Sequence, residues 1–135
     1  MMSDRLFSAA MLSFALALSV PVAAQSPVQS KRVQFAPGKS SATITGTLKG
    51  EQTIDYLVGA KAGQTLSVSF KTSNPSGYFN VLPPTGDTAI FIGSSDGNSF
   101  TGKLPASGDT RVRVYLMRNA ARRNEGTNYT LTIGG

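Results

Sequence analysis

Alternation of apolar and polar side chains at a period of two residues runs through most of this sequence and constrains the fold more than any other feature. In the segment 65–70 (TLSVSF) every second residue is apolar. In 110–116 (TRVRVYL) valine and leucine share one face, and arginine and tyrosine share the other. The same pattern recurs at 41–48, 53–60 and 128–133. Strict alternation is typical of an antiparallel strand with one face on a core and one face in water, so five such strands are predicted.

Turn-forming residues separate these strands at short intervals. Glycine, proline and aspartate cluster at 37–38, 49–50, 62–63, 75–77, 83–84, 96–97 and 107–109. Shorter strands are expected between the turns at 32–35, 78–81, 89–92 and 99–104. About eight or nine short strands at this spacing predict an all-β fold, a single antiparallel β-sandwich.

One segment departs from the alternation. Leu116–Asn124 (LMRNAARRN) contains helix-forming residues and neither glycine nor proline. We expect a short helical turn here, inside a connection from about residue 117 to 127 that is longer than a hairpin loop. Long connections in compact domains commonly carry function, so this loop is a candidate site.

The first 24 residues have the three-part layout of a secretory signal peptide. An apolar run at 6–20 follows Arg5, and small residues at 22–24 allow cleavage after Ala24. The run is about 15 residues long, whereas a spanning helix needs about 20, so cleavage is favoured over the alternative of a membrane anchor. We expect an exported protein without stable membrane insertion, and the family resemblance described below implies the periplasm. The sequence divides into a signal peptide at 1–24, a flexible lead-in at 25–31 and a β-sandwich domain at 32–135.

The residue types that most catalytic sites require are missing. The sequence has no histidine and no cysteine, which excludes a Ser-His-Asp triad, a cysteine nucleophile and a histidine-built zinc site. Six carboxylates follow residue 24, and none stands out as a pair for glycoside hydrolysis. We therefore predict a protein that is not an enzyme, with no metal and no cofactor. An exported chain without cysteine depends on sheet packing for its stability.

One enzymatic alternative is the breaking and rejoining of DNA through a tyrosine nucleophile. Tyr115 lies three residues from Arg118, which supplies the ingredients for such chemistry. Tyrosine is also a common strand residue, and all four tyrosines fall in predicted strands. Export would separate the protein from DNA, so packing is the favoured role for these rings, and nucleic acid is not an expected partner.

Arginine is concentrated near the end of the sequence. Arg118, Arg122 and Arg123 fall within six residues, and two more arginines lie just upstream in a predicted strand. The net charge of +6 favours acidic or anionic partners. A guanidinium group can bind a carboxylate through two parallel hydrogen bonds. In a helix Arg118 and Arg122 would share one face, Arg123 would point elsewhere, and Asn119 could add amide hydrogen bonds. The simpler alternative is a solvated basic loop that serves solubility.

Six short motifs follow one another in a recognisable order. They are VQF at 33–35, GKSSA at 38–42, GTLKG at 46–50, AKAGQ at 60–64, LPASG at 104–108 and RNAARRN at 118–124. Together with Tyr56 they resemble the periplasmic inhibitors of g-type (goose-type) lysozyme. The motifs span most of the chain after residue 32, and the last two are the most specific.

The resemblance implies a small antiparallel β-sandwich whose loops enter and block the active-site cleft of a g-type lysozyme, the protein partner. Matched by motif, the implied contact residues are Arg118, Asn119 and Arg122, with Arg123 as a further basic residue and Tyr56 as a second contact. This sequence departs from the family pattern at 51–55, which is poorer in tyrosine and aspartate.

A second interpretation uses the same basic surface for an envelope binding module that holds peptidoglycan or another anionic polymer, including an anionic glycan. The two interpretations differ in their response to salt. A cleft inhibitor should form a one-to-one complex that survives moderate salt because its contacts are partly buried, whereas a polymer binder should lose affinity steeply.

Overall fold

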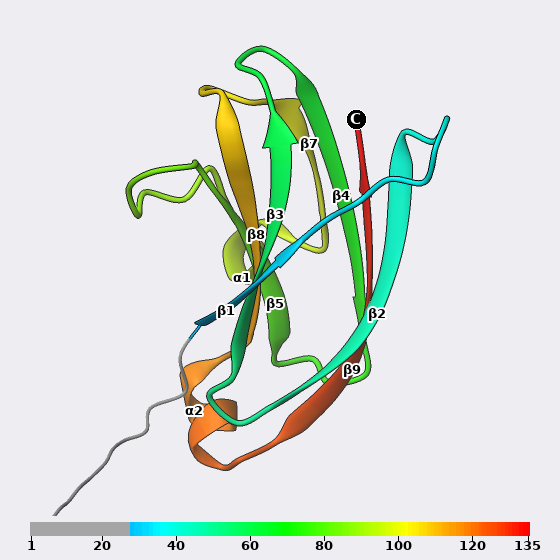
Figure 1. The fold of residues 1–135 in the computed structure, drawn as a ribbon. Helices are drawn as coiled ribbons and strands as arrows, with labels where there is room; N and C mark the ends of the chain where they lie inside the picture. Colours follow the sequence, from blue (N-terminus) through cyan, green and yellow to red (C-terminus); the bar gives the residue numbers. More distant parts are fainter. Residues whose placement is uncertain (1–27) are drawn as a thin grey trace, which may run out of the picture.

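Two β-sheets packed face to face form this protein, whose computed structural model describes residues 28–135 (Figure 1). The first sheet has the strand order β1-β3-β8-β5-β6, and the second has the order β2-β9-β4-β7. The first sheet consists of β1 (Val28–Arg32), β3 (Thr53–Ala60), β8 (Gly108–Leu116), β5 (Gly77–Leu82) and β6 (Phe91–Ile92). The second consists of β2 (Ser41–Lys49), β9 (Gly126–Gly134), β4 (Thr65–Thr72) and β7 (Ser99–Lys103). Two short helices lie in connections, α1 (Gly93–Asp96) and α2 (Arg118–Arg122).

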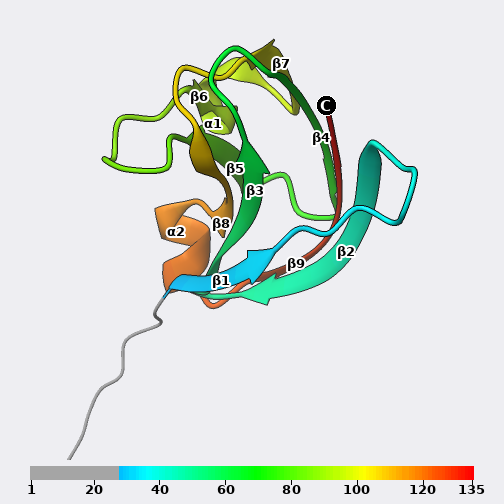
Figure 2. The same ribbon diagram turned by 45° about the horizontal axis from the view of Figure 1, so that its top comes forward.

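This architecture confirms the predicted all-β sandwich. The described residues contain nine strands, all of whose neighbouring pairs are antiparallel except β1 with β3. Figure 2 shows the layers with β3 and β8 on one side, β2 and β9 on the other, and α2 at one end of the sandwich. The helix falls inside the segment 116–124, where the absence of alternation predicted it.

The strand at the beginning of the domain differs from the prediction. We expected a flexible lead-in up to residue 31 and a strand at 32–35, but Val28–Arg32 form β1 and pair in parallel with β3. All five side chains of β1 are exposed, so no apolar alternation marks the segment. This strand forms through backbone hydrogen bonding to β3 at the edge of the sheet, and a pattern of side chains cannot predict such pairing.

Only the second half of the segment expected as a strand at 89–92 forms one. Only Phe91 and Ile92 pair with β5, and the chain then turns into α1. Gly93 permits this close turn, because a Cβ there would lie 2.3 Å from the carbonyl oxygen of Phe79.

The predicted signal peptide at 1–24 and residues 25–27 of the predicted lead-in lie outside the described residues. Within residues 28–135 the helices are too short to cross a bilayer.

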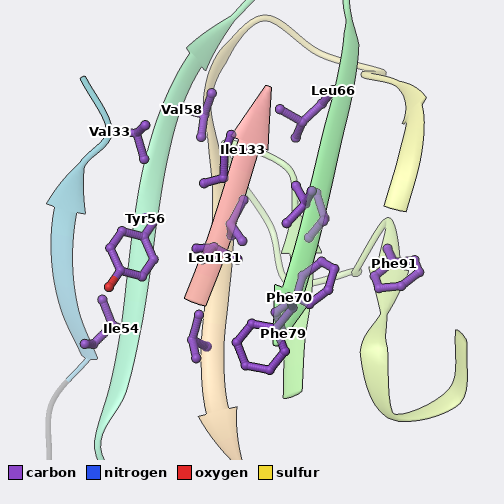
Figure 3. Close-up of a cluster of buried hydrophobic side chains, with 14 of the residues drawn as sticks. Val33, Ile54, Tyr56, Val58, Leu66, Phe70, Phe79, Phe91, Leu131 and Ile133 are labelled. Atoms are coloured by element: carbon purple, nitrogen blue, oxygen red, sulfur yellow. The ribbon is translucent and has the colours of Figure 1, made fainter. Parts of the chain in front are cut away.

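The core lies between the two sheets and is built from alternate residues of both. Phe79 of β5 packs between Phe70 and Phe91, with ring centroids 5.6 and 5.0 Å apart (Figure 3). Leu131 and Ile133 of β9 are fully buried in the same cluster (Figure 3). Burying one such side chain contributes about 1.5–3 kcal/mol to folding. The connections at the ends of the sandwich therefore project from a rigid body.

Two tyrosines share a hydrogen bond inside this apolar core. The hydroxyl groups of Tyr56 on β3 and Tyr129 on β9 are 2.6 Å apart, and both residues are buried. Gly46 makes room for them, because a Cβ at that position would lie 2.5 Å from the Tyr129 hydroxyl. Burial, together with the Tyr56 hydrogen bond, raises the pKa of Tyr129 above its usual value. Neutral Tyr129 therefore contributes its full stability below about pH 10, the usual pKa of a tyrosine, and this contribution is lost as the pH rises through the higher pKa of the folded state.

Replacing Tyr56 with phenylalanine is expected to lower the free energy of unfolding by about 1–2 kcal/mol, because the buried Tyr129 hydroxyl loses its partner. Urea denaturation at neutral pH measures this change. The double variant Tyr56→Phe/Tyr129→Phe is expected to be more stable than Tyr56→Phe alone, since it leaves no hydroxyl unpaired. A Tyr56→Phe variant as stable as the parent would contradict the hydrogen bond.

Candidate functional site

The helix α2 fills the connection between β8 and β9 and lies at one end of the sandwich (Figures 1 and 2). Two of the clustered arginines, Arg118 and Arg122, are its first and last residues. Ala120 and Ala121 are buried, which anchors one side of the helix to the domain. The helix closes at Asn124, whose φ of 57° is left-handed, and the Asn124 N–H donates to the carbonyl of Ala121 at 2.9 Å. This short helix is therefore held at a fixed angle although it would be unstable alone.

The turn between β2 and β3 braces the end of α2. The Gly50 N–H donates to the carbonyl oxygen of Glu125 at 2.8 Å. Gly50 has a φ of 64°, and a Cβ there would lie 2.6 Å from the Asn124 Oδ1 atom. Glycine thus meets two needs at this position, a left-handed backbone and a close approach to the helix end.

Arg118 and Arg122 lie four residues apart on α2 and line the same open hollow, which has a volume of about 740 Å³. Both side chains are exposed, and neither forms an ion pair or hydrogen bond with its side chain within residues 28–135. The hollow is also lined by Val28, Glu51, Arg113 and Tyr115. Of the described lining residues only Glu51 carries a carboxylate, so positive charge prevails there.

Arg123, the third arginine of the cluster, turns away from this hollow. Its guanidinium group contacts the Glu125 carboxylate at 2.7 Å, and Glu125 also accepts a hydrogen bond from the Asn74 amide at 3.0 Å. Arg123 was predicted to point away from the helix face of Arg118 and Arg122, and it does so. Its side chain is held by the carboxylate of Glu125, only two residues away, so its implied role as a further contact remains a prediction.

The two upstream arginines serve the fold. Arg113 on β8 donates to both carboxylate oxygens of the buried Asp55 on β3, at 2.7 and 2.9 Å. Arg111 donates to the carbonyl oxygens of Pro83 and Gly86 and so fixes the loop after β5. Neither was predicted to have such a role, since their partners lie 25 to 58 residues away.

The remaining two predicted contact residues have different surroundings. Asn119 is exposed on α2, and its Oδ1 atom accepts a hydrogen bond from the N–H of Ala120 at 2.8 Å. Tyr56 has only 4% of its surface exposed and is bonded to Tyr129. A partner cannot reach this ring while the sheets are packed, so the prediction of Tyr56 as a second contact does not fit the structure.

Sequence reasoning missed one residue of this surface. Met117 immediately precedes α2, lines the hollow and is 39% exposed, which is unusual for a large apolar side chain in this protein. A signal was present, because Met117 is the position at which the alternation of β8 stops while the side chain remains apolar. An exposed apolar residue beside two arginines is typical of protein interfaces, which are enriched in methionine and arginine.

The tyrosine alternative gains no support from the site. The Tyr115 hydroxyl donates to the Asn80 Oδ1 atom at 3.0 Å, and burial raises the pKa of Tyr115 above its usual value. A phenol held neutral in this way is a poor nucleophile. The described residues also contain no group of three or more acidic side chains that could hold a metal ion.

Acid is expected to loosen the connection that carries α2. The Asn74 amide and the Arg123 guanidinium hold the pKa of Glu125 below its usual value, so this carboxylate favours the folded state. Its contribution is present above about pH 4.3, the unfolded value, and is lost as the pH falls through the lower folded value. An NMR titration should show the Asn74 side-chain amide shifting with a midpoint below 4.3. A midpoint at or above that value would contradict the arrangement.

Comparisons with known sequences and with solved structures both find inhibitors of g-type lysozyme. The sequence is 34% identical over 126 residues to a protein of Escherichia coli strain K12, the inhibitor of g-type lysozyme, and the match covers 92% of each chain. A scan against models of protein families finds no match.

Two solved structures add the spatial match. Aeromonas hydrophila PliG, a periplasmic inhibitor of g-type lysozyme, superposes with a TM-score of 0.72 at 38% identity, over 79% of this chain and 96% of that one. Salmonella Typhimurium PliG, also a periplasmic inhibitor of g-type lysozyme, superposes with a TM-score of 0.61 at 25% identity, over 78% of this chain and 96% of that one. A pre-peptidase C-terminal domain of collagenase from Bacillus anthracis, at 16% identity and a TM-score of 0.55, shares the fold alone.

Proposed function

The chain belongs to the family of inhibitors of g-type lysozyme, and we propose that it binds such a lysozyme and blocks the active-site cleft with α2. The relatives are proteinaceous inhibitors, so the prediction of a protein that is not an enzyme is confirmed. The family membership supports the target class. The assignment of the blocking element to α2 is our own.

This assignment rests on one observation: most arginines of the described domain are bound to groups of the domain itself, and two are not. Residues 28–135 contain six arginines, and four of them are held by groups of their own domain: Arg32 by Asp109, Arg111 by Pro83 and Gly86, Arg113 by Asp55, and Arg123 by Glu125. The other two, Arg118 and Arg122, have no such partner within the described residues and point from one short helix. They are the two guanidinium groups that residues 28–135 leave available to another molecule.

Such a pair suits the chemistry of a lysozyme cleft. Glycoside hydrolysis needs at least one carboxylic acid in a groove, which must be able to give up or take up a proton. A guanidinium group placed against that acid would favour its ionised form and would occupy the space of the glycan. Because α2 is anchored by buried alanines and a braced turn, little ordering would be needed on binding.

We also propose that the chain is exported to the periplasm and cleaved after Ala24. The support is the three-part layout of residues 1–24 and the periplasmic location in the names of the solved relatives. Mass spectrometry of the protein isolated from the periplasm should give a chain that begins at Gln25. A mature chain that begins elsewhere would refute the cleavage site without bearing on inhibition.

The test of the function is an inhibition assay on cell-wall substrate. The mature protein is expected to inhibit g-type lysozyme in a one-to-one complex and to leave c-type and i-type lysozymes active. Inhibition should persist at moderate salt, because the contacts would be partly buried. Equal inhibition of all three types, or binding to peptidoglycan that disappears as salt rises, would favour the anionic-polymer interpretation instead.

A further inference from the structure

The outer face of the second sheet is covered by side chains that end in hydroxyl groups. On β2, Thr43 and Thr45 point outward, because Ile44 and Gly46 face the core. The strands β9, β4 and β7 continue the surface in the same way, with serine or threonine at alternate positions. We call the outward-facing serines and threonines of these four strands the hydroxyl face, whose centre is formed by Thr43, Thr45, Thr130, Thr132, Ser69 and Ser99.

The register of the strands aligns these hydroxyl groups in rows across the sheet. One row crosses all four strands and consists of Thr43, Thr132, Ser69 and Ser99. In the next row Thr45 pairs with Thr130, and Thr130 pairs with Lys71. Within residues 28–135 the only hydrogen bond between side chains of this face joins Ser67 to Thr101, at 3.3 Å. Most of its hydroxyl groups are therefore free to bond a ligand, and each can both donate and accept.

Two shallow hollows follow one another along β9 on this face. One has a volume of about 540 Å³, and Thr45, Thr130 and Lys71 contribute to its lining. The other has a volume of about 290 Å³, and Ser69 and Thr132 contribute to its lining. Neither hollow shares a lining residue with the hollow beside α2. An extended ligand would thus find a continuous polar surface here, separate from the arginines.

Charge on the second sheet is sparse and of one sign. Its four strands contain no aspartate or glutamate and three lysines. Lys49 and Lys103 end the two edge strands at opposite corners of the sheet, and Lys71 lies between them on β4. The first sheet differs, because its strands carry Asp55, Asp109 and three arginines. The hydroxyl face therefore suits a ligand that is uncharged along its length and carries anionic groups at its sides.

We propose that the hydroxyl face binds the glycan strand of peptidoglycan, the polymer that lysozymes cleave. The sugars of this strand present hydroxyl and acetamido groups, which pair with serine and threonine hydroxyls. The short peptides attached to the strand end in carboxylates, which the three lysines would bind. This inference goes beyond the proposed function and uses a different surface from α2, so each can fail without the other.

Other classes of partner fit this face less well. The large apolar side chains exposed in residues 28–135 all lie outside the second sheet, and they are Val28, Phe35, Ile92 and Met117. A protein partner would find no apolar or aromatic anchor on the hydroxyl face, and a lipid surface would find nothing to insert. Nucleic acid binding depends on many phosphate contacts, whereas this face offers three lysines and no arginine.

Sedimentation of the mature protein with insoluble peptidoglycan measures the binding. The protein is expected to sediment with the polymer at about 0.15 M salt and to remain bound at about 0.5 M, because most contacts would join uncharged groups. Arg122→Ala should sediment as the parent does. Absence of binding at the lower salt overturns the proposal. Binding that disappears both at the higher salt and in Arg122→Ala would place the polymer on α2 and overturns it as well.

Two pairs of matched variants test the face itself. Ser69→Glu and Lys71→Glu are each expected to weaken binding at least ~10-fold, because a carboxylate would then face the sugars and the peptide carboxylates. Ser30→Glu and Lys31→Glu make the same changes of charge on β1, whose side chains are also exposed, and should weaken binding less than ~2-fold. Equal losses in the two pairs would show that net charge alone governs binding, and would overturn the proposal.

Binding of g-type lysozyme in solution, without the polymer, separates the two surfaces. Ser69→Glu is expected to bind the enzyme as tightly as the parent, within ~2-fold, because residue 69 lies outside the hollow beside α2. Thermal melting confirms that the variant is folded, as expected for a change at an exposed position. Loss of both the polymer and the enzyme by a folded Ser69→Glu variant would mean one shared site and would overturn the proposal.

Discussion

Replacing Arg122 with alanine is expected to raise the inhibition constant for g-type lysozyme at least ~10-fold without changing the thermal stability of the protein. Arg122 is exposed and has no side-chain partner within residues 28–135, so its loss should cost the fold nothing. In the complex its removal would leave a desolvated carboxylate of the enzyme unpaired, which typically costs about 2–5 kcal/mol. Titration of lysozyme activity with each variant measures the constant.

The neighbouring arginine provides a matched control. Arg123→Ala removes the same charge one residue further along, but from a side chain that is already paired with Glu125. Its inhibition constant is expected to change less than ~3-fold, the effect of a peripheral charge. Equal losses for the two variants would mean that net charge and not placement governs inhibition. An unchanged constant for Arg122→Ala would remove α2 from the mechanism.

Replacing Asp55 with alanine is expected to have the largest effect on stability among the polar changes, a loss of about 2–4 kcal/mol. Asp55 is buried and binds Arg113 through two hydrogen bonds, while the Arg113 side chain is 28% exposed. Without the carboxylate this guanidinium group would remain half-buried with no charge to balance it. The partial exposure of Arg113 keeps the expected loss below that of a fully enclosed pair.

Urea denaturation of Asp55→Ala and of Asp109→Ala makes this comparison direct. Asp109 also forms a two-bond ion pair, with Arg32, but both of those side chains are largely exposed. Exposed pairs contribute little, so Asp109→Ala should be much less destabilised than Asp55→Ala. Similar losses in the free energy of unfolding for the two variants would show that burial does not determine how much each ion pair contributes to stability.

Local patterns were sufficient to predict most strands. β4, β8 and β9 carry an unbroken alternation because one face packs on the core and the other faces water. The helix α2 was predictable for the converse reason, since its segment has no alternation. β1 could not be found in this way, because all its side chains are exposed and only its backbone is paired.

The candidate site was predictable only in part, because which side chains are free to bind a partner depends on contacts between residues far apart in the sequence. Nothing near Arg113 indicates that Asp55, 58 residues away, neutralises it. The alternation placed Tyr56 with Ile54 and Val58 on the face expected to pack on the core, whereas the family resemblance implied that Tyr56 contacts the partner. Its contact with Tyr129, 73 residues away, fixes the answer. Arg118 and Arg122 were identified correctly as one face of a helix, because a spacing of four residues is a local property.

The position of the first described strand has a practical consequence. Val28, where β1 begins, lines the same hollow as Arg118 and Arg122, whereas Gly135 lies at the far end of the sandwich, bonded to Ser40 (Figure 1). A fluorophore, affinity tag or biosensor surface attached ahead of Val28 would sit beside the arginines and shield them. The same attachment after Gly135 would orient the arginines toward the solution, so immobilisation through the carboxyl end is the geometry for measuring capture of an enzyme.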